Sequence, residues 1–447
     1  MIGLLAANAC YLAIGACITR RVGLAYVVGV AVVGIATAHL ALIHVPIGLL
    51  ELLVVAVALG IYRWRRRWIR PELGEHPGVV GGVLLVLALG LLVKATAAFA
   101  VRPLIEWDGW AIWAMKARAL FDFGGVQHDV FTTAPYAPLQ HPLLLPSLEA
   151  TGFRAIGSYD GTLIHLQLAL LALGFALGLW TLLRERVGSP LAGVAVLAIV
   201  AADSTLRQLA GNLADIPLAM FVALGLLCLG RWLLEADRGL LALGAVFLGA
   251  ATLTKPEGLL FASAALLAAA VAWRRDLLWG ALGVVAIYAP WRIFVAAHHL
   301  RNQEYSLGDA LDPSYLADRS ERVRPAVSGV WHQVWASGWS WLVPFALVSL
   351  GAALLAQRWR LSAFAAIWAM LSFGGIVLVF WISVVPIQLT LLWAAYRTVA
   401  SLVIGAAALA PLLAGEAWRT TRIRARSDER STDASPRPVS VASSSGS

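Results

Sequence analysis

Two acidic residues, Glu106 and Asp108, stand among tryptophans directly after an apolar run that extends from about residue 79 to residue 100. Such a run is long enough to cross a membrane as a helix, so both carboxylates should lie at the membrane boundary. Ionisable groups at that depth are costly and generally functional. A carboxylate there can take a proton from a hydroxyl group, which makes Asp108 a candidate general base. Glu106 is a second catalytic candidate that could position a substrate, bind a cation or simply face water.

The segment that follows has the spacing of a helix. Between residues 108 and 121, one helical stripe carries Trp110, Trp113, Ala117, Leu120 and Phe121. This stripe, with its basic flanks, is typical of a helix that lies in the membrane interface, and Gly124-Gly125 should end it. Asp108 occupies the N-cap position, so capping of the free N–H groups is the alternative role of this acid.

Several basic residues lie near the ends of predicted spans, on the same side as the acids, where they could hold a lipid phosphate. The candidates are Lys255, Arg207 and Arg397, with Lys116 on the interfacial helix. Any one such residue is more often a side chain whose charged end reaches the membrane surface. The collection on one side is therefore more informative than its members.

Three further polar residues are candidate substrate contacts. Tyr136 and His141 belong to a segment with four prolines between residues 135 and 146, which predicts a rigid, extended chain. A plain connector over the bundle is the alternative interpretation of that segment. Asp215 precedes Pro217 at the start of a span, where capping of a helix N-terminus is equally reasonable.

The composition indicates an all-α polytopic membrane protein. Of the 447 residues, 60% are hydrophobic and 13% are charged, whereas soluble domains are nearer one half and one quarter. The mean hydropathy is +0.79. The net charge of +9 is carried by short basic clusters between apolar runs. That distribution indicates membrane topology, not nucleic-acid binding. The three cysteines lie in apolar runs, so we expect no disulfide and no thiol-bound metal.

Runs of about twenty apolar residues predict about thirteen transmembrane helices. They lie near residues 2–18, 22–43, 46–62, 79–100, 162–183, 190–203, 213–234, 239–253, 257–272, 277–297, 337–356, 361–384 and 396–415. The short runs at 190–203 and 239–253 predict tilted, kinked or partly re-entrant helices.

Basic clusters between the spans all fall on one side, which the positive-inside rule makes cytoplasmic. Two long loops, 101–161 and 298–336, then lie outside. We therefore divide the chain into N-terminal transmembrane helices (1–78), a main transmembrane module (79–415) and a cytoplasmic tail (416–447). The tail is rich in serine, proline and charge towards its end and is predicted to be disordered.

An ordered set of short motifs resembles the GT-C superfamily of membrane glycosyltransferases. The resemblance is in particular to the bacterial relatives of protein O-mannosyltransferases and aminoarabinose transferases, which are like glycosyltransferase family 39. The motifs are Glu106-Trp-Asp108, Trp113-Ala-Met-Lys-Ala-Arg118, the proline-rich segment 136–146, Ala214-Asp-Ile-Pro-Leu-Ala219 and Leu253-Thr-Lys-Pro-Glu-Gly-Leu259. Three predicted spans precede the acidic motif, where many relatives have one, and no soluble C-terminal domain follows.

The resemblance implies transfer of a sugar from a polyprenyl-phosphate donor to an acceptor hydroxyl at the outer face of the inner (plasma) membrane. It implies that Asp108 is the general base and that the anomeric carbon is inverted. Lys255 and Arg207 would hold the donor phosphate, with Arg397 behind them. It calls for no cofactor and no essential metal, and it leaves a lipid, a glycan or a protein as acceptor.

Two other functions are compatible with these features. A transporter or glycolipid flippase could use the same charges as a gate or a headgroup site. Such proteins need functional polar residues through the depth of the membrane and often show internal repeats, and we find no repeat in this sequence. The second of these functions is that of a noncatalytic membrane scaffold, but a scaffold has no need for so many basic groups beside an acidic loop.

Overall fold

The computed structural model describes residues 1–65, 78–134, 138–272, 274–306 and 308–433. Within these ranges the chain forms helices and no β-strand, which confirms the predicted all-α class. The longer helices of the first half are α1 (Ile2–Ile18), α2 (Val22–Leu42), α3 (Leu49–Arg65), α4 (Val79–Phe99), α8 (Gly161–Val187) and α9 (Ser189–Ala201). Those of the second half are α11 (Asp215–Glu235), α12 (Arg238–Thr254), α13 (Glu257–Ala269), α14 (Leu277–Ala297), α17 (Leu342–Leu355), α18 (Trp359–Ile382) and α20 (Tyr396–Asp433).

Shorter helices occupy the two long loops and the bends. The first loop holds the π-helix η1 (Gly109–Ala114), α5 (Met115–Phe123), α6 (Asp129–Thr132) and α7 (Leu144–Ile156). The bend after α9 holds α10 (Asp203–Ala210). The second loop holds η3 (Asp309–Leu311), α15 (Pro313–Asp318), η4 (Ser320–Arg322), α16 (Val323–Val334) and η5 (Ser337–Trp339), and α19 (Ile387–Thr390) with η6 (Leu391–Ala395) precedes α20.

Each predicted span corresponds to a helix, but the number that cross the membrane differs from thirteen. Seven described helices are long and apolar enough to cross, or up to nine if each of two bent pairs forms one span. One bent pair is α9 with α10, at 53°, in the region where the short run predicted a kink. The count of thirteen is therefore not confirmed, because several apolar helices are shorter than a membrane crossing.

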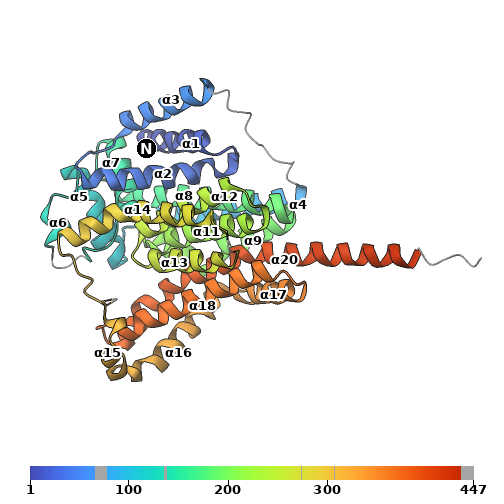
Figure 1. Cartoon of the computed structure of the whole chain (residues 1–447). Coiled ribbons are helices and arrows are strands. Elements are labelled where there is room, and N and C mark those ends of the chain that lie inside the picture. Colours follow the sequence, from blue (N-terminus) through green and yellow to red (C-terminus); the bar gives the residue numbers. More distant parts are fainter. Residues whose placement is uncertain (66–77, 135–137, 273, 307, 434–447) are drawn as a thin grey trace, which may run out of the picture.

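The long helices run roughly parallel, and α11 lies at the centre of the bundle (Figure 1). It contacts α8, α12, α13 and α20, and nearly all of its residues are buried. Because α11 is packed on every side, an apolar surface around its whole circumference is expected. One end of the bundle carries the helices of the two long loops: α5 and α6 lie at the left of Figure 1, and α15 lies at the lower left. We call it the loop end.

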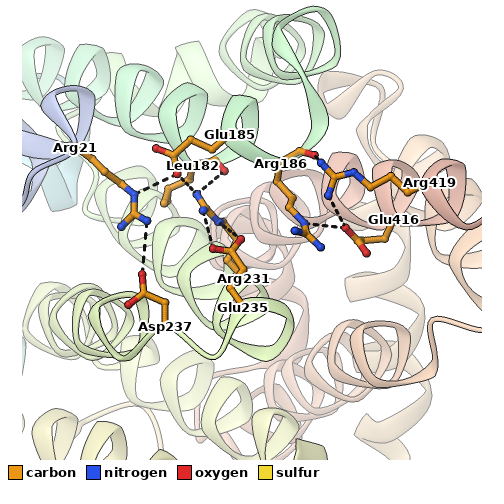
Figure 2. Close-up of polar contacts among 9 residues, drawn as sticks. All are labelled: Arg21, Leu182, Glu185, Arg186, Arg231, Glu235, Asp237, Glu416 and Arg419. Atoms are coloured by element: carbon orange, nitrogen blue, oxygen red, sulfur yellow. Dashed lines mark hydrogen bonds and ion pairs between the residues drawn. The ribbon is translucent and has the colours of Figure 1, made fainter. Parts of the chain in front are cut away.

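The opposite end, which we call the arginine end, is held by ion pairs between helices (Figure 2). Arg231 of α11 lies 2.5 Å from Glu185 of α8 and 2.9 Å from Glu235. Arg21 contacts Glu185 at 3.2 Å and Asp237 at 3.6 Å. A buried guanidinium is tolerated only when its charge and its donors are satisfied, and Arg231 meets this condition.

A second network at this end joins α8 to α20. Arg186 contacts the buried Glu416 at 2.8 Å, and Arg419 contacts it at 3.1 Å. Helix α20 continues through Asp433, beyond the other helices (Figure 1). The predicted disordered tail (416–447) therefore begins as helix, and residues 434–447 lie outside the described part of the chain.

The closest helix crossing joins α1 and α2 through paired glycines. A Cβ on Gly15 would lie 1.7 Å from the carbonyl oxygen of Ala25, and a Cβ on Gly29 would lie 1.8 Å from that of Tyr11. Small residues at such crossings let two backbones approach closely inside a membrane. The contact leaves no room for any side chain.

We therefore expect Gly29→Val to destabilise the bundle by at least ~1–3 kcal/mol, the usual cost of overpacking. The thermal unfolding temperature of the purified protein in detergent should fall by several degrees. Gly90→Val is the matched control, since a Cβ on Gly90 of α4 meets nothing within 4 Å. Equal unfolding temperatures for the two variants would contradict this account of the crossing.

Candidate active site at the loop end

Asp108 forms an ion pair that the sequence did not specify. Its carboxylate lies 2.5 Å from a guanidinium nitrogen of Arg397, the second residue of α20. The two side chains are 23% and 13% exposed, so the pair is partly withdrawn from water. Asp108 stands at the N-cap of η1 but makes no capping hydrogen bond with its side chain. The capping explanation of this acid is therefore wrong, because the carboxylate is directed across to α20.

A second ion pair lies where three other helices end. Lys255, in the turn between α12 and α13, donates to Asp215 at 2.7 Å and contacts Glu257 at 3.2 Å. Asp215 is the first residue of α11 and is 3% exposed, while Lys255 is 8% exposed. Burial alone would lower the pKa of Lys255, but Asp215 and then Glu257 raise it above the usual range. The amine is therefore a stable cation.

The two ion pairs belong to one group. The negative charges of Asp215 and Asp108 stabilise the positive charge of Arg397, and the positive charge of Arg397 in turn lowers the pKa of Lys255. The Nε atom of Arg397 and one carboxylate oxygen of Glu257 are buried without a hydrogen-bond partner. The group therefore holds cations that are already paired, together with polar atoms that remain available to a ligand.

The second long loop adds Glu304 to this group. Glu304 is exposed at the surface. Desolvation by the surrounding residues nevertheless raises the pKa of its carboxyl group, and the negative charge of Glu257 raises it further. The same pKa is lowered by the positive charges of Lys255 and Arg397 and raised by the negative charge of Asp108. We call the set of Asp108, Asp215, Lys255, Glu257, Glu304 and Arg397 the charged cluster.

The loop segment that carries Glu304 is anchored to the corner after α18. The carbonyl of Glu304 accepts a hydrogen bond of 2.8 Å from the N–H of Val384. Arg319 donates at 2.6 Å to the carbonyl of Ser383, which Arg322 also contacts. These bonds hold the second loop next to the cluster. No sequence pattern indicated this contact, because Glu304 has no motif around it.

Lys116 has a structural role. Its amine is fully buried and donates to the carbonyls of Pro138, Leu139 and His141 at 3.0, 3.4 and 3.0 Å. Burial lowers the pKa of Lys116 to about 7, but the three acceptors oppose this shift, because only an ammonium has three N–H donors. Lys116 thus fixes the end of the proline-rich segment and has no donor left for a substrate.

His141 lies beside the cluster. Its ring makes an edge contact with Trp113 at 5.3 Å, and its Nδ1 atom is buried without a partner. Burial lowers its pKa, and the charges of Lys116, Lys255 and Arg397 lower it further. A neutral imidazole near three cations is suited to hydrogen bonding with a ligand, and unsuited to carrying a positive charge.

The other predicted residues lie at the margin of the cluster or outside it. Arg207 is 68% exposed and pairs with Asp203 at 2.6 Å, one turn along α10. Glu106 is exposed and packs its side chain against Gly211. Tyr136 lies outside the described residues.

Another buried carboxyl group, which no sequence pattern indicated, lies near Asn212. Glu149 of α7 is 2% exposed, and neither of its oxygens makes a hydrogen bond. The amide of Asn212 lowers the pKa of this carboxyl, against the larger effect of burial, and Asn212 also donates to the carbonyl of Gly109 at 3.1 Å. The Oδ1 atom of Asn212 is likewise buried without a partner. The carboxyl group of Glu149 and the Oδ1 atom of Asn212 are thus neighbouring acceptors that lack a donor. A proton on Glu149 would supply that donor.

The pH dependence of stability tests this protonation. Burial raises the pKa of Glu149 from 4.5 to about 8. The folded protein therefore favours protonated Glu149. The contribution of this residue to the free energy of unfolding is fully present below about pH 4.5 and is lost as the pH rises towards about 8. We expect Glu149→Gln to reduce the loss of thermal stability of the purified protein between pH 5 and pH 8.5. Asp122→Asn, at an exposed pair on α5, should keep the wild-type slope. An unchanged slope in Glu149→Gln would contradict a neutral Glu149.

Comparison with known proteins gives one match. The family model of the dolichyl-phosphate-mannose-protein mannosyltransferases matches residues 140–294, which is about one third of the chain. A search of curated proteins and a search of solved structures found no match. The matched segment contains Asp215, Lys255 and Glu257 of the charged cluster, whereas Asp108, Glu304 and Arg397 lie outside it. Together with the apolar helices, the match supports a GT-C-like, mannosyltransferase-like membrane glycosyltransferase.

Proposed function

We propose that the protein transfers a sugar from a polyprenyl-phosphate donor to the hydroxyl group of an acceptor, with Asp108 as the general base. The observation that carries this proposal is the ion pair of Asp108 with Arg397, beside the Lys255–Asp215 pair, at one end of a helical membrane bundle. A partly exposed carboxylate and two cations supply the groups that such a transfer requires. The positive-inside rule would place this loop end outside the cytoplasm.

The reaction needs one proton transfer and one bond exchange. The acceptor oxygen attacks the anomeric carbon from the face opposite to the phosphate, so the configuration inverts. The bond between that carbon and the phosphate oxygen breaks, and its electron pair leaves with the polyprenyl phosphate. Asp108 receives the acceptor proton as the new bond forms and the hydroxyl becomes more acidic. The contact with Arg397 orients the carboxylate of Asp108 for this transfer.

Arg397 and Lys255 are the cations best placed to stabilise the leaving phosphate. The unpartnered Nε atom of Arg397 can donate to a phosphate oxygen without breaking the bond to Asp108. Negative charge that develops on the phosphate is stabilised strongly by fixed cations in a site with little water. We place the phosphate at this pair, and not at Arg207, because Arg207 is exposed and bound to Asp203.

The acceptor would approach between the two loops. Glu304 belongs to the charged cluster and comes from the second loop, and His141 lies beside the cluster in the first loop. Both have hydrogen-bonding groups that can orient a sugar or an acceptor hydroxyl. The acceptor can be a lipid, a glycan or a protein, since each can present a hydroxyl group for this reaction.

We expect Asp108→Asn to abolish transfer while the protein stays folded in membranes. Loss of a general base lowers rates by about 10²–10⁴-fold. Release of polyprenyl phosphate from a panel of polyprenyl-phosphate sugars measures the activity of the purified protein. Asp203→Asn, which removes an exposed acid from an ion pair on α10, is the matched control and should remain active. Unchanged release by Asp108→Asn would refute the catalytic assignment.

Lys255→Ala should raise the donor requirement more than the acceptor requirement. Loss of one charge-assisted hydrogen bond to the phosphate, worth ~1.5–3 kcal/mol, corresponds to a rise in donor KM of about tenfold or more. The variant leaves Asp215 buried and unpaired, so Lys255→Ala/Asp215→Asn is included to separate folding from binding. Donor and acceptor KM values that shift equally in the folded double variant would remove Lys255 from the phosphate site.

A further inference from the structure

A groove of about 540 Å³ lies between α12 and α14, near the arginine end of the bundle. Its floor is apolar and is lined by small residues, among them Ala242, Ala245, Gly280 and Gly283. The nearest atom to a Cβ on Gly283 would be the Cβ of Ala245, at 3.5 Å. Small residues on the facing surfaces of the two helices therefore leave room for the hollow, which Leu241, Val246 and Ile287 also line.

The floor of this groove faces the surrounding membrane. Helix α14 is a candidate span, and only 22% of its most apolar window is buried inside the protein. Trp279, at the groove, is 76% exposed. Tryptophan prefers the level of the lipid headgroups, so the rim of the groove should lie at that level. A chain that enters from the membrane would follow the floor towards Ile287.

Two arginines at the rim have no partner among the described residues. Arg238 begins α12, and Arg275 precedes α14; both line the groove and both are exposed. Neither side chain forms an ion pair or a hydrogen bond in the described part of the chain, unlike those of Arg21 and Arg231 nearby. The charges at the rim are therefore available to a ligand.

The one acid at the rim is already neutralised. Asp276 accepts hydrogen bonds from Arg274 at 3.1 and 3.2 Å and from the indole N–H of Trp232 at 3.2 Å. The guanidinium of Arg274 also lies over the ring of Trp232 at 5.2 Å. Asp276 thus does not compensate Arg238 or Arg275, and the rim keeps a net positive charge.

We propose that this groove binds one anionic glycerophospholipid, with an acyl chain on the apolar floor and the phosphate between Arg238 and Arg275. Guanidinium groups bind phosphate through several charge-assisted hydrogen bonds. Basic pockets between transmembrane helices are suited to anionic headgroups. The headgroup site is separate from the charged cluster, because α12, with 17 residues, places Lys255 about 25 Å away along the helix.

Lipid binding to the full-length purified protein tests the proposal. Native mass spectrometry would compare phosphatidylglycerol with phosphatidylcholine of the same acyl chains. We expect the wild-type protein to retain phosphatidylglycerol at least about fivefold more than phosphatidylcholine. In Arg238→Gln/Arg275→Gln this preference should fall below about twofold. Arg360→Gln is the matched control, since Arg360 is exposed near the start of α18 and outside the groove; it should keep the preference.

A second variant separates the groove from general surface charge. Gly283→Phe fills the floor but keeps both arginines, and it should also reduce retention of phosphatidylglycerol at an unchanged unfolding temperature. Equal retention of the two lipids by the wild type, or full retention by either groove variant, would overturn the proposal. Polyprenyl phosphate that displaces phosphatidylglycerol at equal concentration would identify the sugar carrier as the occupant and overturn the assignment to a phospholipid. Sugar transfer is not part of the readout, so the result is independent of the proposed function.

Discussion

Mutual compensation of charge at the loop end is the constraint on which the candidate site depends. Asp108, Asp215, Lys255 and Arg397 are all partly or fully withdrawn from water, and an isolated charge there would be very costly. Each is tolerated because an opposite charge lies within 2.5–2.7 Å. The partners belong to different helices, so the ion pairs also fix where η1, α11, α20 and the α12–α13 turn meet. The same contacts that stabilise this junction supply the base and the cations of the proposed reaction.

The sequence was sufficient to predict the helices and to name four residues of the charged cluster among the site candidates. Apolar length determines where a membrane helix begins and ends, and this signal is local. Asp108, Asp215, Lys255 and Arg397 were all found because they stand at the ends of apolar runs on one side of the membrane. Their pairing was not predicted. A capping role for Asp108 was equally consistent with its position, and only the fold shows Arg397 opposite to it.

Residues whose roles depend on distant neighbours could not be predicted. Glu149 lies within an apolar helix of the first loop, and its burial arises from α7 packing against α1, α2 and α8. Lys116 was placed off the apolar stripe of its helix, yet it is fully buried because the proline-rich segment folds over it. Glu304 has no surrounding pattern at all. The number of spans is likewise a tertiary property, since bends of 53° and 106° change which helix pairs can cross.

Helix α20 has a mechanical consequence for the site. It runs for 38 residues, with Pro411 inside it, about 57 Å at the usual rise, from Arg397 at the loop end, past Glu416, to a portion that stands free of the other helices (Figure 1). The guanidinium that pairs with Asp108 and the carboxylate that pairs with Arg186 at the arginine end therefore belong to one helix. The position of the partner of Asp108 thus depends on how α20 is anchored at the opposite end of the bundle.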